Sequence, residues 1–449
     1  CEDGIIFSQP ITLNHTSYSS KMYSAIAVKK QIPSMTILLI CFLFCSLTFP
    51  ASAQQYKLKA DLDPYILLPG AYQKTPEDLE KHFDKGGFKS NPYFKWLTKQ
   101  KDRAIFKRRP AGNMEIEMTI LDGKVPIEEM IIDFRDGKFL GVTISVFNRG
   151  DGGKITSADF AERFAAIGKH LGTQLDTRSR KREGNIKKGV MTHGYVWSSR
   201  RGKAVLLCNP DVEDPLKPKK MEFMRMRLAR KDAKGIYEAA LEERSQATVR
   251  KSQLERNVKT DKDNVFISGI PMVDQGNKGY CVVASAQRLF EYYGIACDMH
   301  QLAQLAKSDP DKGTSSLYIN EQLGSIDYLF KTRFTCLAVS YNGGLVELKD
   351  DKFVGKSIPR RSFDKFIQKN IDDGIPLLWS MTLGLKPEIP KINPQANGGH
   401  MRMIIGYNEK DNKIIFSDSW GAGHEFKTMD ADDAYAVTTG LYLMEPTVN

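Results

Sequence analysis

The sequence contains few of the motifs that identify common classes of proteins. It has no P-loop, no dinucleotide-binding fingerprint and no cysteine and histidine spacing typical of a zinc finger. Only 7 of 449 residues are cysteines and none belongs to a C-x-x-C pair, which excludes a disulfide-rich scaffold. No internal repeat is evident. We therefore expect no cofactor and no metal, and no specific nucleic-acid partner although the net charge is +11.

Long hydrophobic runs are also scarce, and the clearest one is too short to cross a membrane. It occupies residues 36–48, whereas a membrane-spanning helix needs about 20 residues. Two lysines precede the run, and an Ala-Ser-Ala cleavage site ending at Ala53 follows it. This order is typical of a secretory signal. It predicts an upstream segment and signal peptide over 1–53, a secreted or periplasmic protein, and no transmembrane helix after cleavage. A buried core helix is the alternative.

The rest of the chain divides by charge. Hydrophobic residues make up 41% and charged residues 27%, which excludes a disordered chain. Residues 54–263 hold 43 basic and 30 acidic side chains, a net charge of +13, whereas residues 264–449 hold 19 and 22, a net charge of −3. We predict an α+β fold with an accessory domain at 54–232, a helical linker at 233–263 and a C-terminal domain at 264–449.

The accessory domain shows local signals of helices and antiparallel strands, but no catalytic constellation. Four signals carry this prediction: a capped helix start at Thr75-Pro76, a hairpin turn at Asp136-Gly137, a helix cap at Ser157 and a two-residue alternation over 222–228.

Cys281 lies where a helix is predicted to begin. Apolar residues recur after it at the spacing of one helix face, a glycine-containing loop precedes it, and Gly294 is a natural stop. A thiol at a helix N-terminus faces the positive end of the helix dipole and unpaired N–H groups, which lower its pKa and make it a nucleophile. The alternative, common for a lone cysteine, is a small buried hydrophobic side chain.

Three more polar residues are placed as partners for this thiol. Gln275 lies six residues earlier, and its amide can share an oxyanion with the Cys281 backbone N–H. His400 opens an apolar segment typical of a strand, a polar turn follows at 408–412, and the returning strand ends at Asp418. Asp418 can therefore accept a hydrogen bond from one ring nitrogen of His400 and orient the other toward Cys281.

The order of these residues resembles that of the papain-like cysteine peptidases. The shared pattern is Gln275-x5-Cys281, Gly399-His400 and Asp418-Ser419-Trp420-Gly421. Glu291-Tyr292-Tyr293-Gly294, Gly374-Ile375-Pro376 and a Gly-His followed by Gly-Tyr are similar to the bacteriocin-leader-processing (double-glycine) branch. The resemblance covers about residues 264–445. It implies a papain-like catalytic domain, in which the helix carrying the nucleophile packs on an antiparallel sheet, and it implies that Trp420 shields the contact between Asp418 and His400.

Two positions depart from the classical pattern. Asp418 stands where papain has asparagine, and aspartate orients a protonated histidine equally well. Tyr280 precedes the cysteine where papain-type enzymes have a small residue. The second departure bears on substrate preference and leaves the nucleophile unchanged.

Together the residues predict a secreted cysteine peptidase that acts on a protein or peptide substrate. Cys281 would attack the carbonyl, His400 would move the proton, Asp418 would orient His400, and Gln275 would stabilise the oxyanion. Two other functions stay open. One is an amide hydrolase or transglutaminase-like acyl transferase with the same triad, and the other is a catalytically silent binding module.

The basic accessory domain has two interpretations. It could dock on the acidic catalytic domain and cover its cleft, as a pro-region would, or it could hold the enzyme to an anionic surface or polymer. Its length and its strand-rich pattern favour the second, accessory role. The basic run at 178–188 is interpreted as a solvated loop.

Four residues near the site pattern receive no catalytic role. We interpret His424 as a surface or loop histidine and His300 as a structural residue of a helix. Cys297 and Cys336 form either a disulfide or two buried thiols.

Overall fold

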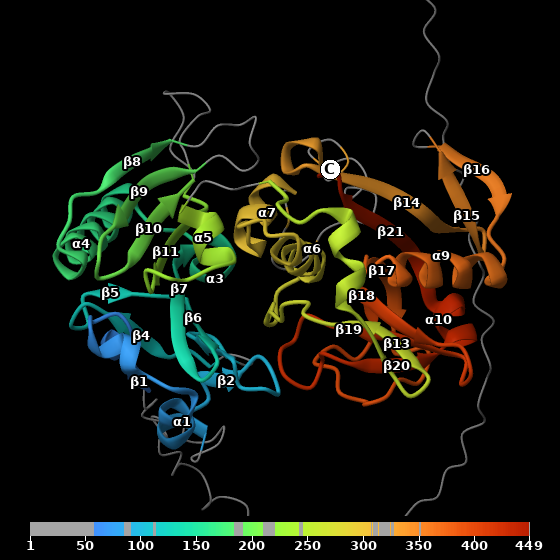
Figure 1. The fold of residues 1–449 in the computed structure, drawn as a ribbon, viewed down its shortest axis with the longest axis horizontal. Coiled ribbons are helices and arrows are strands. Elements are labelled where there is room, and N and C mark those ends of the chain that lie inside the picture. Colours follow the sequence, from blue (N-terminus) through green and yellow to red (C-terminus); the bar gives the residue numbers. More distant parts are fainter. Residues whose placement is uncertain are drawn as a thin grey trace, which may run out of the picture. The chain divides into compact units, whose positions relative to one another are not determined.

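The computed structural model describes residues 58–84, 91–110, 114–183, 192–209, 221–241, 246–306, 308, 313, 324, 327–349 and 352–448 (Figure 1). The predicted signal segment and its cleavage site lie outside these residues. Tyr56–Asn449 form a compact unit, which contains all the elements below. In the described ranges, no helix has the length and apolar character needed to span a membrane.

The first half of the compact unit is built on an antiparallel sheet of eight described strands. In sheet order these are β2 (Phe94–Trp96), β3 (Arg103–Lys107), β6 (Glu129–Arg135), β7 (Lys138–Asn148), β11 (Phe223–Ala229), β10 (Lys203–Cys208), β9 (His193–Ser198) and β8 (Arg180–Glu183). A smaller sheet contains β1 (Lys59–Asp61), β4 (Glu117–Ile120) and β5 (Val125–Pro126). The helices are α1 (Pro76–Leu79), α3 (Arg149–Gly152), α4 (Ser157–Leu175) and α5 (Ile236–Leu241), with helical turns at Asp63–Tyr65, Gly70–Gln73 and Glu80–Asp84.

The second half is built on an antiparallel sheet of ten described strands. Eight follow in the order β12 (Val258–Asp261), β13 (Asn264–Ile267), β18 (Gly398–Asn408), β17 (Leu377–Leu383), β21 (Thr438–Pro446), β14 (Thr332–Tyr341), β15 (Gly344–Lys349) and β16 (Lys352–Ser357). β19 (Lys413–Ser417) pairs with β18 and β20 (Lys427–Asp430). The helices are α6 (Cys281–Tyr292), α7 (Met299–Leu305), α9 (Arg360–Asp372) and α10 (Ala431–Val437), with short turns at Lys251–Gln253, Glu255–Asn257 and Asp327–Phe330. The predicted α+β class is thus confirmed.

Several local predictions in the first half hold. Thr75 caps α1 in a reciprocal capping box with Asp78. Asp136 and Gly137 both have positive φ, at 53° and 69°, and join β6 to β7 in a two-residue hairpin turn. The prediction for α4 is wrong by one residue, because the Thr156 side chain caps it by accepting from a backbone N–H three residues on.

The alternation over 222–228 does predict a strand, β11, but the strand is buried on both faces. Its polar members, Arg225 and Arg227, are each only 4% exposed. The range 233–263 also contains more than a linker, because β12 begins at Val258 and belongs to the second sheet.

Helix α6 begins at Cys281, as predicted, and packs against β18 and α7 (Figure 1). Its apolar face is buried through Val282, Ala286, Leu289 and Phe290. Burial of such side chains stabilises a fold by roughly 1.5–3 kcal/mol each for the larger ones. This helix is therefore a rigid base for the residue at its N-terminus.

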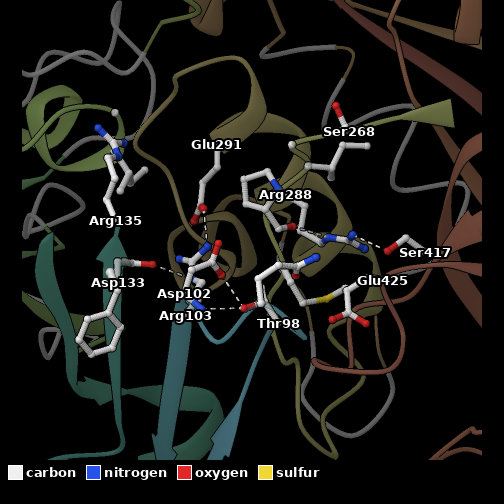
Figure 2. A pocket seen from close by; sticks show the side chains of 18 of the residues that line it. Thr98, Asp102, Arg103, Asp133, Arg135, Ser268, Arg288, Glu291, Ser417 and Glu425 are labelled. Carbon is white, nitrogen blue, oxygen red and sulfur yellow. Dashed lines mark hydrogen bonds and ion pairs between the residues drawn. The ribbon is translucent and has the colours of Figure 1, made fainter. Parts of the chain in front are cut away.

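A cavity of about 700 Å³ lies between the two sheets and is lined by residues from both halves (Figure 2). Arg103 of β3 stands in it between Asp133 of β6 and Glu291 of α6. On another side Arg288 of α6 donates to the Ser417 hydroxyl at the end of β19. The cavity thus adjoins both α6 and the hairpin of β18 and β19.

Candidate active site

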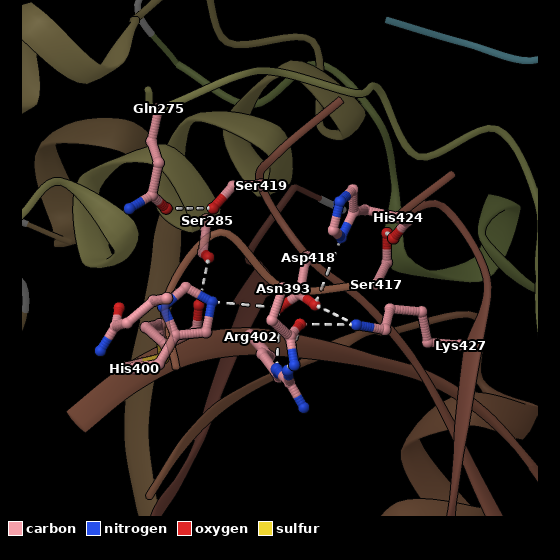
Figure 3. Close-up of polar contacts among 12 residues, drawn as sticks. Gln275, Ser285, Asn393, His400, Arg402, Ser417, Asp418, Ser419, His424 and Lys427 are labelled. Atoms are coloured by element: carbon pink, nitrogen blue, oxygen red, sulfur yellow. Dashed lines mark hydrogen bonds and ion pairs between the residues drawn. The ribbon is translucent and has the colours of Figure 1, made fainter. Parts of the chain in front are cut away.

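The structure brings the four predicted site residues together. Cys281 is the first residue of α6, and Gln275 lies in the loop before it. His400 is the third residue of β18, and Asp418 directly follows β19. Figure 3 shows His400 directed at Asp418, with Gln275 held beside the chain that follows Asp418.

The pairing of β18 with β19 explains the contact between the histidine and the aspartate. Met403 pairs with Ser417 in this antiparallel ladder, which places Asp418 next to Arg402. His400 lies two residues before Arg402 in β18. Side chains two residues apart share one face of a strand. His400 Nε2 lies 3.0 Å from Asp418 Oδ1, and both side chains are fully buried.

The thiol of Cys281 interacts with the same histidine ring. Nδ1 of His400 forms no hydrogen bond of ordinary geometry with the described residues, yet the thiol is close enough for each group to shift the pKa of the other. Cys281 is partly exposed, whereas His400 is 3% exposed. The histidine ring is therefore protected from water.

The electrostatics favour a charged pair. Burial raises the pKa of the Cys281 thiol, but the interaction with the His400 ring and nearby backbone N–H groups outweigh burial and hold this pKa below its ordinary value. Burial lowers the pKa of His400, but the interactions with Asp418 and Cys281 outweigh it and raise this pKa. Both shifts stabilise a thiolate beside an imidazolium, which is the reactive form of a cysteine nucleophile.

These shifts predict a bell-shaped dependence of kcat/KM on pH. The thiolate is lost as pH falls through the lowered thiol pKa, and the imidazolium is lost as pH rises through the raised histidine pKa. Because the groups are coupled, the two apparent pKa values belong to the pair. Initial rates across acidic and alkaline buffers measure the profile. A single rise through the ordinary thiol pKa would contradict the ion pair.

Gln275 is oriented by Ser419, a residue of the resemblance motif to which sequence analysis gave no role. The Ser419 hydroxyl donates to Gln275 Oε1 at 2.6 Å, and the Gln275 backbone N–H donates to the Ser419 carbonyl at 2.8 Å. Gln275 Nε2 donates one hydrogen to the Lys278 carbonyl at 3.1 Å. With its oxygen engaged, the amide directs its nitrogen away from Ser419 and has a second N–H for an oxyanion.

Asp418 also belongs to a buried network of charges that sequence analysis missed. Arg402 Nε donates to Asp418 Oδ1 at 2.8 Å and its Nη1 to Glu388 at 2.5 Å. Lys427 Nζ contacts Asp418 Oδ2 at 3.3 Å and also donates to Glu388 and Asn393. Burial raises the pKa of Asp418, but Arg402 and the histidine hydrogen bonds outweigh it and hold this pKa well below its ordinary value. The carboxyl group of Asp418 that contacts His400 is therefore ionised.

Trp420 covers the other side of the histidine. Its ring stacks on His400 with centroids 4.2 Å apart and planes 3° apart. His424 was predicted to be a surface or loop histidine. It does lie in a loop, but it is only 7% exposed: it packs edge-on against Trp420, and its Nδ1 lies 3.8 Å from Asp418 Oδ2. The turn after Asp418 folds back under the site and buries it.

The remaining residues lie apart from this geometry. His300 is buried in α7, and neither ring nitrogen has a hydrogen-bond partner among the described residues. Cys297 is a buried free thiol, so a Cys297–Cys336 disulfide is not formed in this structure. Within the described ranges, no group of three or more His, Cys, Asp or Glu side chains is arranged to hold a metal ion.

Comparisons with known proteins find a family match for part of the chain. Residues 267–441 match the model of the Peptidase_C39 like family. Among solved structures, the chain is similar to xylellain, a cysteine protease from Xylella fastidiosa, at 11% identity and a TM-score of 0.26, over 46% of this chain and 93% of that one. No curated protein matches the chain. The family match supports the resemblance to the papain-like cysteine peptidase superfamily for this segment, and the protein is a cysteine-type peptidase.

Proposed function

We propose that the protein is a secreted or periplasmic peptidase that hydrolyses peptide bonds through Cys281, His400, Asp418 and Gln275. The observation that carries the proposal is the assembly of a thiol at a helix N-terminus with a buried histidine and aspartate. Secretion rests on the apolar run at 36–48 and the cleavage site after it.

The proposed reaction proceeds in two halves. The Cys281 thiolate attacks the scissile carbonyl, and the oxyanion accepts hydrogen bonds from the Gln275 amide and the Cys281 backbone N–H. The His400 imidazolium gives its proton to the leaving amine as the C–N bond breaks. His400 then takes a proton from water, whose oxygen attacks the thioester carbonyl. The C–S bond breaks and the sulfur leaves as a thiolate, which restores the thiolate–imidazolium pair. Asp418 stays ionised and holds the ring throughout.

The test combines labelling with substrate profiling on purified protein. We expect a peptidyl electrophile to modify Cys281 alone, and we expect a mixture of unlabelled peptides to be cleaved at internal bonds. Mass spectrometry locates both the adduct and the cleavage sites. Release of ammonia from side-chain amides without backbone cleavage would favour an amide hydrolase or acyl transferase. Absence of labelling together with absence of turnover would favour a silent binding module.

A further inference from the structure

The loop that carries Gln275 rests on the first sheet. Alternation along β3 places Ile105 on the same strand face as the residues at both ends of the strand. Leu97, Ile105 and Ile131 from the first half form a small buried cluster with Met272, three residues before Gln275. All four side chains are at most 5% exposed. The oxyanion loop is therefore anchored on this sheet by apolar contact.

Two lysines flank the apolar contact and hold one carboxylate of the same loop. Lys95 Nζ of β2 lies 2.6 Å from Asp274 Oδ2, and Lys107 Nζ of β3 lies 3.3 Å from the same oxygen. Lys107 Nζ also donates to the Asp274 carbonyl at 3.3 Å. Asp274 is 4% exposed and directly precedes Gln275. Burial raises the pKa of Asp274, but the two lysines outweigh it and hold this pKa well below its ordinary value.

Lys95 reaches a second part of the site as well. Its Nζ donates to the carbonyl of Trp420 at 3.2 Å, and Trp420 is the residue whose ring stacks on His400. Trp420 and Asp274 also pair through their backbones as an isolated β-bridge. One ammonium group thus ties the loop of the oxyanion donor to the segment that covers the histidine.

The residue after Gln275 also packs closely against one of the two lysines. Gly276 has φ of +69°, and a Cβ added there would lie 2.6 Å from Lys107 Nζ. Arg103, at the start of β3, makes a further contact by pairing with Glu291 near the end of α6 at 3.0 Å (Figure 2). The same two strands therefore contact both the loop before Cys281 and the helix after it.

We propose that Lys95 and Lys107 are positioning residues of the peptidase site, which act through Asp274 to hold Gln275 in place for the oxyanion. The inference rests on the proposed function. It assigns the first sheet a role in the chemical step, in place of a cover over the cleft or a tether to an anionic polymer. Cys281 stays partly exposed while these contacts are formed, which argues against a cover.

The experiment compares Lys95→Met, Lys107→Met and Asp274→Asn with the parent on one peptide substrate. Loss of a single oxyanion donor costs about 10²–10³ in kcat, so a displaced donor should cost about tenfold or more. We expect kcat to fall with KM nearly unchanged, and we expect Lys95→Arg to restore most of it. Alkylation of Cys281 by iodoacetamide needs no oxyanion donor, so its rate and its pH profile should match those of the parent.

Two further variants sharpen the result. Lys59→Met removes an exposed lysine that pairs with Glu117 at 3.1 Å in the same half of the protein, and it should leave kcat unchanged. A Lys95→Met/Asp274→Asn double variant should lose no more kcat than the less active of the two single variants, because both changes break the same contact between Lys95 and Asp274. If Lys107→Met does not fold, the other two variants carry the test.

Unchanged kcat in the folded Lys95→Met and Asp274→Asn variants would overturn the inference. So would a loss of kcat matched by an equal loss of the alkylation rate, since that would show a general structural effect. Failure of the proposed function would look different, because the parent itself would then show no peptide cleavage that depends on Cys281.

Discussion

Replacement of Cys281 with alanine is expected to abolish peptide hydrolysis and to leave the fold intact. The variant loses the sulfur that forms the thioester, and alanine favours the helical conformation of this position in α6. Because only one sulfur atom is removed, the truncation leaves at most a small cavity. Turnover of a peptide substrate and thermal unfolding measure the two effects. A folded variant with parental turnover would refute the assignment of the nucleophile.

Cys297 is the matched control for this substitution. It lies in the same half of the protein but is 2% exposed, and burial raises the pKa of its thiol to about 12. A thiol protonated at neutral pH and closed to solvent has no nucleophilic role. Cys297→Ala and Cys336→Ala should therefore leave the chemical step largely unchanged, so that only the loss of Cys281 removes activity.

The parts of the site that could be predicted are those that local sequence determines. The apolar spacing after Cys281 and the loop before it determine a helix start. The turn at 408–412 separates two strands and thereby returns Asp418 to His400. Each of these features needs only neighbouring residues, and the family pattern supplied their order. The domain boundaries drawn from charge and composition stay a prediction.

The parts that could not be predicted depend on contacts between distant residues. Lys107 and Asp274 are 167 positions apart, and the Lys95 contact with Trp420 spans 325. No periodicity links such positions, and a lysine in a strand is usually solvated. The place of Arg402 beside His400 could have been predicted, because Arg402 lies two residues after His400 on a predicted strand and therefore shares its face.

The predicted cap of α4 shows a smaller limit of sequence-based prediction, which concerns neighbouring residues. Thr156 and Ser157 both carry a hydroxyl that can accept from a backbone N–H, and both precede the apolar positions of α4. Sequence spacing alone does not distinguish them. The observed bond from the Asp159 N–H to the Thr156 hydroxyl, at 3.1 Å, decides the start of the helix.

His400→Ala is expected to lower kcat by about 10²–10⁴, the usual contribution of a positioned proton donor and acceptor. Asp418→Asn should cost less, because the amide oxygen still accepts from His400 and the ring keeps part of its productive orientation. Loss of the negative charge should lower the pKa of His400, so the alkaline limb of the pH profile should move to lower pH. A greater loss for Asp418→Asn than for His400→Ala, with both variants folded, would contradict these roles.

Asp418→Ala is a different experiment, because it also unbalances the buried network. Asp418 and Glu388 neutralise Arg402 and Lys427, and all four side chains are at most 5% exposed. Without Asp418, two buried cations face one carboxylate. Removal of one partner from a buried ion pair typically destabilises a protein by about 3–5 kcal/mol. Urea unfolding should therefore show a large loss of stability for Asp418→Ala and a smaller one for His400→Ala. If Asp418→Ala is as stable as the parent, the buried network does not stabilise the site in the way that the distances indicate.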